Sequence, residues 1–160
     1  MRLQTDMLVL KRTCEAGWVD FNGHMRDAYY VLVVSFANDQ TMDELGLGPK
    51  YLKASGHTLY NIDTHIRYLK EAHDGDPLTV EMRLIDADDK RLHLHSVIRH
   101  DETGDALAVN ESLLLHVDQL RGPRSAPFPP QVAELVKRRL HRDSGTPLEL
   151  RAGHIGIKRK

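Results

Sequence analysis

The feature that most constrains the fold is a strongly apolar segment, residues 28–37, with the sequence AYYVLVVSFA. From about Arg26 to Leu45 the apolar positions recur every three or four residues, which is the period of an α-helix. The positions that carry this period are Ala28, Val31, Leu32, Ser35, Phe36, Asp39 and Met42. Because the first half is apolar on nearly every side, we expect a helix enclosed by protein that ends near Gly46. Its valines make a strand the competing interpretation, but length and flanking glycines favour a helix.

Strand patterns surround this helix. The expected strands cover residues 7–14, 57–69, 78–87, 92–98 and 107–117. Most of them alternate apolar and polar residues, as a strand with one buried face does. Turn residues separate the strands, and residues 48–56 are expected to form a loop. One apolar helix beside one antiparallel sheet predicts an α+β fold in which the sheet wraps around the helix.

The last 40 residues differ from the first 120, so we expect one domain in residues 1–120 and a C-terminal extension in residues 121–160. The extension starts with a Pro-rich linker, continues with a short amphipathic helix at 131–140, and ends in a basic tail. From Lys137 onward there are eight Lys or Arg and two acids. A solvated, partly frayed tail is the expected state, and attraction for a polyphosphate group is the alternative.

Composition excludes several classes of protein. A chain of 160 residues can bury a core of its own, and its formal net charge of -1 creates no field that attracts nucleic acid or membranes. Cys14 is the only cysteine, so no disulfide forms within the chain, which fits a reducing compartment. The apolar patch near the N-terminus is too short for a signal peptide, and no run could span a bilayer. We therefore expect a cytoplasmic protein.

The polar residues directly before the helix are the candidates for a catalytic site. The segment from Trp18 to Tyr30 reads WVDFNGHMRDAYY. A buried helix N-terminus offers N–H groups that can polarise a carbonyl, and Gly23 lets a substrate approach the backbone. Asp20 could attack an activated carbonyl or take a proton from water, with Asn22 and His24 orienting either group. On the residues alone, a plain turn and helix cap is an equally good interpretation, because Asx and Gly are common turn residues.

A resemblance to a known family favours the chemical interpretation. The segment DFNGHMRDAYY resembles the hotdog-fold acyl-CoA thioesterases of the 4-hydroxybenzoyl-CoA thioesterase type, in the branch with Asp-x-Asn-Gly-His at this place. The later IRYLKEAHDGDPLTVEMRLI resembles the second and third strands of that family, joined by a Gly-Asp turn. The match covers about Leu8 to Val117. Where many members have an aromatic residue soon after the glycine, this chain has Arg26-Asp27, which leaves open how the acyl pocket is closed.

The resemblance implies an assembly and a set of site residues. It implies a homodimer or dimer of dimers formed by joining two sheets, with active sites at the dimer interface. Asp20 corresponds to the catalytic carboxylate, as nucleophile or as general base. Its implied companions are Asn22, Gly23, His24 and Met25 at the thioester carbonyl, and Tyr60, Asn61 and Asp63 of the second copy at the acyl group. Acyl-CoA is the implied partner, and no cofactor beyond coenzyme A itself is expected.

The acyl group is inferred from residues near the motif. Trp18, Phe21 and Tyr29 precede or begin the helix, and Tyr60 and Asp63 can come from the second copy. Aromatic faces with a carboxylate suit a quaternary ammonium group, by about 0.5 to 2 kcal/mol per ring. The chain is also similar to the thioesterases of bacterial carnitine breakdown, which implies betainyl-CoA as the candidate substrate. The alternative is that the aromatic residues are ordinary core residues.

Other interpretations of the sequence are weaker. His93 and His95 share a strand face, but solvent-facing histidines are expected there rather than a metal site. Asn110-Glu111-Ser112 interrupts the last strand and is expected to mark a bulge rather than to line the site. No glycine-rich nucleotide motif is present. There are two alternative functions. One is a hotdog hydratase or dehydratase, and the other is an acyl-CoA-binding module without catalysis.

Overall fold

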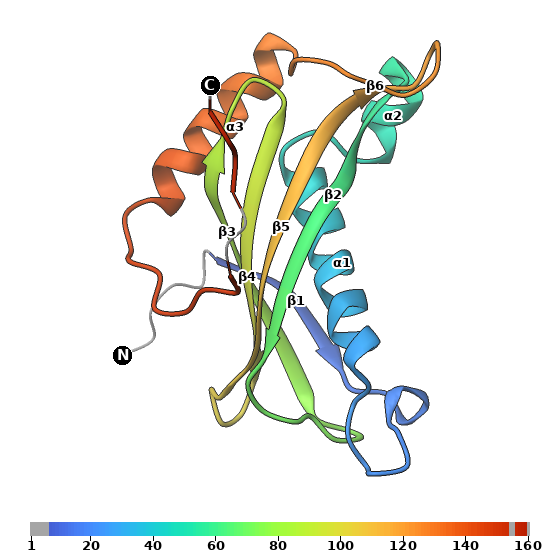
Figure 1. The fold of residues 1–160 in the computed structure, drawn as a ribbon, viewed down its shortest axis with the longest axis vertical. Coiled ribbons are helices and arrows are strands. Elements are labelled where there is room, and N and C mark those ends of the chain that lie inside the picture. The colour runs from blue at the N-terminus through green and yellow to red at the C-terminus, as the bar shows by residue number, and fades with distance from the viewer. Residues whose placement is uncertain (1–6, 154–155, 160) are drawn as a thin grey trace.

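The structure, a computed structural model, describes residues 7–153 and 156–159 and contains one curled antiparallel sheet around a long helix (Figure 1). The strands are β1 (Leu8–Thr13), β2 (His57–Tyr68), β3 (Pro77–Ala87), β4 (Arg91–His100), β5 (Ala106–Asp118) and the short β6 (Arg124–Ser125). The helices are η2 (Ala16–Trp18), α1 (Asp27–Glu44), α2 (Pro49–Ser55) and α3 (Pro130–Asp143). The strand order is β1-β3-β4-β5-β2, with β6 on β5. The predicted α+β hotdog architecture is confirmed.

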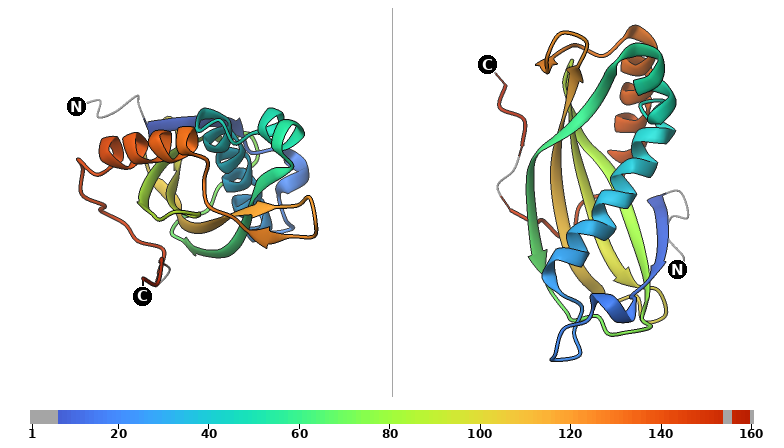
Figure 2. Two further views of the ribbon diagram at one scale, coloured as in Figure 1. Left: turned by 90° about the horizontal axis from the view of Figure 1, so that it is seen from above. Right: turned by 90° about the vertical axis from the view of Figure 1, so that its right-hand side faces the viewer.

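The alternating patterns place the core on the inner face of the sheet. Val80 of β3 lies opposite Ile98 of β4, and Leu84 lies opposite Leu94. All four side chains are buried in the main core, which also contains the buried face of α1. Figure 2 shows α1 lying along the concave side of the sheet. The period of two in the strands therefore creates the surface that the helix covers.

Helix α1 has nearly the predicted bounds, but it is not enclosed on every side. Tyr30, Val33 and Val34 are buried, whereas Val31 and Leu32 are exposed. The expectation of a helix wrapped in protein is wrong for this stripe, because the sheet of a single chain covers only one side of the helix. None of the helices in the described residues is long and apolar enough to cross a membrane.

The segment expected to be a loop contains helix α2. Pro49 occupies its first turn, where the missing N–H costs nothing, and Gly56 ends it with a left-handed φ of 71°. The loop prediction was wrong because Gly48-Pro49 is also a common way to start a helix.

Helix α3 packs on the same core as the rest of the chain. Val132 and Val136 belong to the main core cluster, together with Phe128 of the preceding linker. The buried Asp143 carboxylate accepts a hydrogen bond of 2.8 Å from the backbone N–H of Leu84, where the register of β3 against β4 shifts. Residues on both sides of position 120 therefore share one core.

The C-terminal residues cross the outer face of the sheet, opposite α1 (Figure 2). We call residues 146–153 and 156–159 the strap. Ala152 of the strap is buried against Val97 and Val109, which point away from the main core. The expectation of a solvated tail is therefore wrong, because the outer face of the sheet carries apolar side chains that the strap covers.

The buried Glu111 of β5 anchors the strap. Its carboxylate accepts hydrogen bonds of 2.7 and 3.0 Å from Arg151 and one of 2.8 Å from the N–H of Ala152. The same carboxylate lies 2.9 Å from Nε2 of His93. His93 and His95 are buried rather than solvent-facing as expected, because the strap lies over them, and Nε2 of His95 bonds to the Leu150 carbonyl at 2.8 Å.

Residues 110–112 continue β5 without the expected bulge. Glu111 pairs in register with His65 of β2 and His95 of β4. The bulge prediction was wrong. A polar residue stands at position 111 because its carboxylate faces the strap and forms ion pairs with His93 and Arg151.

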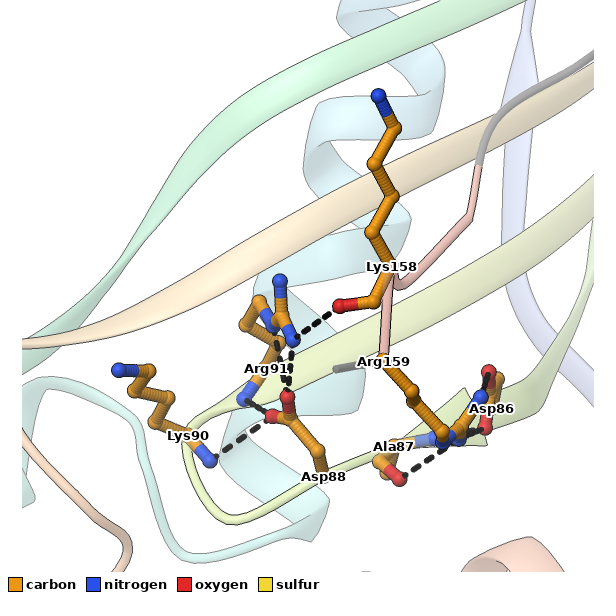
Figure 3. A network of polar contacts seen from close by, with 7 residues as sticks. All are labelled: Asp86, Ala87, Asp88, Lys90, Arg91, Lys158 and Arg159. Carbon is orange, nitrogen blue, oxygen red and sulfur yellow. Dashed lines mark hydrogen bonds and ion pairs between the residues drawn. The ribbon is translucent and has the colours of Figure 1, made fainter.

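Figure 3 shows how the end of the strap joins the β3–β4 hairpin. Arg159 forms an ion pair with the Asp86 carboxylate, and Arg91 donates to the Lys158 carbonyl at 3.4 Å. Because Arg151 and Arg159 both pair with carboxylates inside the chain, neither is left free to attract a polyphosphate group.

Candidate active site

Asp20 heads a compact turn just before helix α1. Val19 and Met25 form an antiparallel bridge, and the Gly23 N–H donates to the Asp20 carbonyl at 3.0 Å. The Asp20 carboxylate accepts hydrogen bonds from the backbone N–H of Asn22 at 2.8 Å and of His24 at 3.3 Å. Gly23 has a φ of 79°, which only glycine adopts without strain. The motif therefore folds as an Asx-type turn in which two backbone N–H groups hold the Asp20 carboxylate.

The same hydrogen bonds control the charge of Asp20. Desolvation raises the pKa of its carboxyl, but the N–H donors of Asn22 and His24 and the positive charge of Arg26 lower it more. The pKa therefore lies below the ordinary value of 3.8. The group is a partly exposed carboxylate that is ionised at neutral pH, as a general base or nucleophile must be.

The backbone donors of the turn are already engaged. The N–H of Gly23 and of His24 bond within the turn, and the N–H of Met25 donates to the Ala72 carbonyl at 2.7 Å. The sequence-based expectation placed these groups at a thioester carbonyl, whereas in this structure all three have acceptors inside the chain.

The N-terminus of α1 provides another donor. Arg26 is the N-cap and makes no side-chain cap, and the Ala28 N–H is taken by the Asp27 carboxylate at 2.9 Å. The hydrogen bonds of the described residues leave the N–H of Asp27 without an acceptor. This donor lies at the positive end of the helix dipole, where a developing oxyanion is stabilised.

A pocket of about 280 Å³ opens at this helix end. The lining residues come from the turn, from the start of α1, and from the end of β2 with the segment that follows it: His24, Met25, Asp27, Tyr30, Tyr68, Leu69, Lys70 and Glu71. The hydroxyl of Tyr68 donates to the Asp27 carbonyl at 3.3 Å. Sequence analysis missed the contribution of residues 68–71, because no local pattern shows that the end of β2 reaches the start of α1.

The aromatic residues near the motif have different environments. Trp18 is only 7% exposed and stacks on Tyr29, with ring centroids 5.3 Å apart and planes 12° apart. Phe21 is 93% exposed at the tip of the turn. In a single chain, the Phe21 side chain is thus accessible to a ligand, whereas Trp18 is buried and supports the turn.

Tyr60, Asn61 and Asp63 are exposed on β2, at a distance from the turn. Tyr60 precedes Tyr68 by eight residues along the strand, which is about 26 Å at the usual rise per residue. The Asn61 side chain bonds to Thr64 at 2.8 Å, and Gln119 donates to the Tyr60 hydroxyl at 2.8 Å. One chain does not bring these residues to Asp20, so a shared site requires a second copy.

No cluster that could hold a metal ion is found among the described residues. Neither His24 nor the strand histidines belong to a group of three or more potential ligands in this part of the chain. The structure provides an ionised carboxylate in the turn, and a helix N-terminus at an open pocket that His24 of the same turn lines. Groups of these kinds can act in attack on a carbonyl.

Comparison with known families decides the class of the protein. The model of the thioesterase-like superfamily matches residues 14–136, which include the Asp20 turn, α1 and the four long strands β2 to β5. This chain belongs to the thioesterase-like superfamily. The predicted enzyme class, thioester hydrolase, is confirmed by this membership.

Individual relatives agree with the superfamily match. The chain is 45% identical over 120 residues to a betainyl-CoA thioesterase of Pseudomonas aeruginosa, with 75% of each chain covered. It is also 45% identical over 114 residues to an L-carnitine dehydrogenase/betainyl-CoA thioesterase of Agrobacterium fabrum, covering 71% of this chain and 23% of that protein. The chain thus spans about a quarter of the length of the two-activity relative.

Solved structures share the whole architecture. A Staphylococcus aureus protein solved in complex with CoA superposes with a TM-score of 0.84 at 27% identity, covering 96% of both chains. A 1,4-dihydroxy-2-naphthoyl-CoA thioesterase from Synechocystis superposes with a TM-score of 0.71 at 18% identity, covering 86% of this chain and 97% of that one. The second likeness supports the fold alone.

Proposed function

We propose that this chain hydrolyses betainyl-CoA to betaine and coenzyme A. The observation that carries the substrate assignment is the 45% identity to the Pseudomonas aeruginosa protein named betainyl-CoA thioesterase, over three quarters of each chain. The region that matches the superfamily, residues 14–136, includes the Asp20 turn, the pocket and β2. Coenzyme A enters as part of the substrate.

Asp20 is the group that we propose activates the attack. As a general base, its carboxylate takes a proton from water while the water oxygen attacks the thioester carbonyl. The C–S bond then breaks, and the departing thiolate of coenzyme A takes up the proton. As a nucleophile, the carboxylate attacks the carbonyl itself and releases the thiolate, and water then hydrolyses the resulting anhydride. Both routes need an ionised carboxylate, which the lowered pKa of Asp20 supports.

The start of α1 is the proposed site of carbonyl polarisation. The N–H of Asp27 is at the first helical position, and the pocket that contains Asp27 also contains His24 of the turn. An N–H at a helix N-terminus becomes more effective once a substrate excludes water from the pocket. The thioester carbonyl would lie between this donor and the Asp20 carboxylate.

A homodimer formed through β2 completes the proposed site. β2 is an edge strand of the sheet, and most of its residues are exposed, including Ile62 at 48% and Tyr68 at 49%. An exposed apolar edge is the usual surface for strand pairing with another chain. Antiparallel pairing of two copies of β2 would bring the start of one strand beside the end of the other. Tyr60 and Asp63 of one copy would thereby approach the turn of the other.

The cationic acyl group is proposed to bind between aromatic and acidic side chains. Phe21 at the tip of the turn and Tyr60 of the second copy offer ring faces, and Asp63 offers a carboxylate. A quaternary ammonium group has no N–H to donate, so ring faces and opposite charge are the means to recognise it. The buried Trp18 and the half-buried Tyr29 are assigned to support of the turn instead.

The experiment that tests this function is free-thiol release from a panel of acyl-CoA thioesters that includes betainyl-CoA and acetyl-CoA. We expect betainyl-CoA to turn over fastest, and Asp20→Asn to lower kcat on the order of a hundredfold or more. Asn keeps the ability to accept the turn hydrogen bonds, so the variant should remain folded. Equal turnover of betainyl-CoA and acetyl-CoA would remove the substrate assignment, and an active Asp20→Asn variant would remove the catalytic role of Asp20.

A further inference from the structure

Tyr30 joins helix α1 to the segment that follows β2. Its side chain is only 3% exposed, and its hydroxyl accepts a hydrogen bond from the Ala72 N–H at 3.0 Å. The same hydroxyl donates to the Lys70 carbonyl at 3.4 Å. One phenol oxygen on the first turn of the helix therefore holds both ends of residues 70–72.

The held segment in turn holds the Asp20 turn. The carbonyl of Ala72, which is fully buried, accepts the N–H of Met25 at 2.7 Å. Met25 forms the bridge with Val19 that closes the turn. The contacts therefore run from the Tyr30 hydroxyl through Ala72 and Met25 to the base of the turn that presents Asp20.

The hydroxyl and the ring of Tyr30 have separable roles. The ring packs edge-to-face against Tyr68, with centroids 5.3 Å apart and planes at 80°, and phenylalanine would keep that contact. Burial raises the pKa of the Tyr30 hydroxyl, so it stays protonated and can donate to Lys70 throughout the working pH range. Removing only the oxygen would leave the Ala72 N–H buried without an acceptor.

We infer that Tyr30 is a positioning residue of the thioesterase site, whose hydroxyl sets the Asp20 turn relative to the N-terminus of α1. The inference rests on the proposed function, because it assumes that Asp20 and the helix end act on the same carbonyl. The turn is an exposed loop, whereas Tyr30 is part of the buried face of a long helix. A residue of the buried helix face thus fixes the position of an exposed turn, and a small displacement of a catalytic group is enough to slow a reaction strongly.

The test compares Tyr30→Phe with Tyr51→Phe as the matched control. Tyr51 also has a bonded hydroxyl, which lies 2.8 Å from Nε2 of His116, but that contact joins α2 to β5 away from the Asp20 turn. With the best thioester of the panel, we expect Tyr30→Phe to lower kcat about tenfold or more while KM changes less than about twofold. Tyr51→Phe should leave kcat within about twofold of the parent.

Two further measurements separate positioning from loss of stability. If the turn loosens, its N–H donors hold the Asp20 carboxylate less well, and the acid limb of the kcat profile moves to higher pH in Tyr30→Phe alone. Amide hydrogen exchange at Met25 should also become faster in Tyr30→Phe but not in Tyr51→Phe.

The outcomes of the inference and of the proposed function are distinguishable. Parent-like kcat and pH profile in Tyr30→Phe would overturn the positioning role, and so would equal losses of kcat in the two tyrosine variants. An Asp20→Asn variant that keeps full activity would instead overturn the proposed function. Loss of activity in Asp20→Asn with an unchanged Tyr30→Phe would reject only the inference about Tyr30.

Discussion

Asp20 shows how one residue can satisfy two interpretations that its sequence context leaves open. The turn interpretation is correct, because the N–H groups of Asn22 and His24 bond to the carboxylate. The same two bonds lower the pKa of Asp20 and keep it charged, which is what the chemical interpretation needs. At the residue scale, the hydrogen bonds that form the turn therefore also keep the carboxylate charged, which the proposed catalytic role requires.

Asp63 provides a prediction at the residue scale. It is exposed on β2, where the proposed dimer would bring it to the acyl group of the substrate. Asp63→Asn should raise KM for betainyl-CoA about tenfold, because one favourable charge contact with the cation is lost, and leave KM for acetyl-CoA unchanged. Steady-state kinetics with the two thioesters measure the difference.

The control for Asp63 is Glu149→Gln, which makes the same change of net charge at an exposed position of the strap, the segment that crosses the outer face of the sheet. It should leave KM for both thioesters unchanged. If Asp63→Asn raised KM for both thioesters by the same factor, Asp63 would not recognise the positive charge of the acyl group.

At the scale of elements, β5 and the strap depend on each other. β5 places Glu111 on the outer face of the sheet, where a buried charge without partners would be strongly destabilising. Burial raises the pKa of Glu111, but hydrogen bonds from His93, from Arg151 and from the Ala152 N–H lower it far below its ordinary value of 4.5. The strap supplies two of these three partners, so its attachment and the charge of Glu111 are coupled.

This coupling predicts how stability depends on pH. Because the pKa of Glu111 is lower in the folded chain, its contribution is present above about pH 4.5 and is lost as the pH falls toward the lowered value. Glu111→Gln should reduce the free energy of unfolding by about 2 kcal/mol near neutral pH, and by less near pH 3. Urea denaturation at both pH values measures the two differences.

Glu134→Gln is the matched control for Glu111. Glu134 pairs with Arg138 one turn along α3, and both side chains are exposed. Its substitution should change the free energy of unfolding by less than about 0.5 kcal/mol. A difference between Glu111→Gln and the parent that is equal at both pH values would contradict the assigned role of the charge.

At the scale of the whole molecule, several exposed apolar residues lie on α1 and on the β2 edge of the sheet. Val31 and Leu32 of α1 are exposed, and so are Ile62 and Tyr68 of the β2 edge. The strap instead covers part of the outer face of the sheet, around Val97 and Val109 (Figure 2). The β2 edge and the exposed stripe of α1 are therefore the surface that we propose for a second copy.

Ile62 tests the assembly. It lies at the irregularity between Asn61 and Asp63, where β2 shifts its register against β5, and 48% of its surface is exposed. Ile62→Asp should convert a dimer into single chains, because a charge at the centre of the edge opposes strand pairing, and should abolish activity with it. Size-exclusion chromatography with light scattering measures the mass.

Leu135→Asp is the control for Ile62, since Leu135 is an exposed apolar residue on α3, outside the proposed interface. It should leave mass and activity unchanged. A dimer that persists in Ile62→Asp, with full activity, would show that β2 is not the interface.

The sequence by itself determined the elements whose causes are local. The helical period and the flanking glycines defined α1 to within one residue at each end, and alternation defined the strands of the sheet. The order of these elements, with the Asp-x-Asn-Gly-His segment before the helix, was enough to indicate the architecture and the family. Each of these signals lies within a window of a few residues, where side-chain period follows directly from backbone geometry.

Only the tertiary structure decided the contacts between distant segments. Examples are the Arg151–Glu111 ion pair, 40 residues apart, and the Ala72–Tyr30 hydrogen bond, 42 residues apart. A polar residue such as Glu111 looks like a local irregularity until its partner is known, and a basic tail looks solvated until its docking surface is known. Pairing across such distances depends on how the sheet curls and which faces meet. No local period records that arrangement, because it arises from packing of the whole chain.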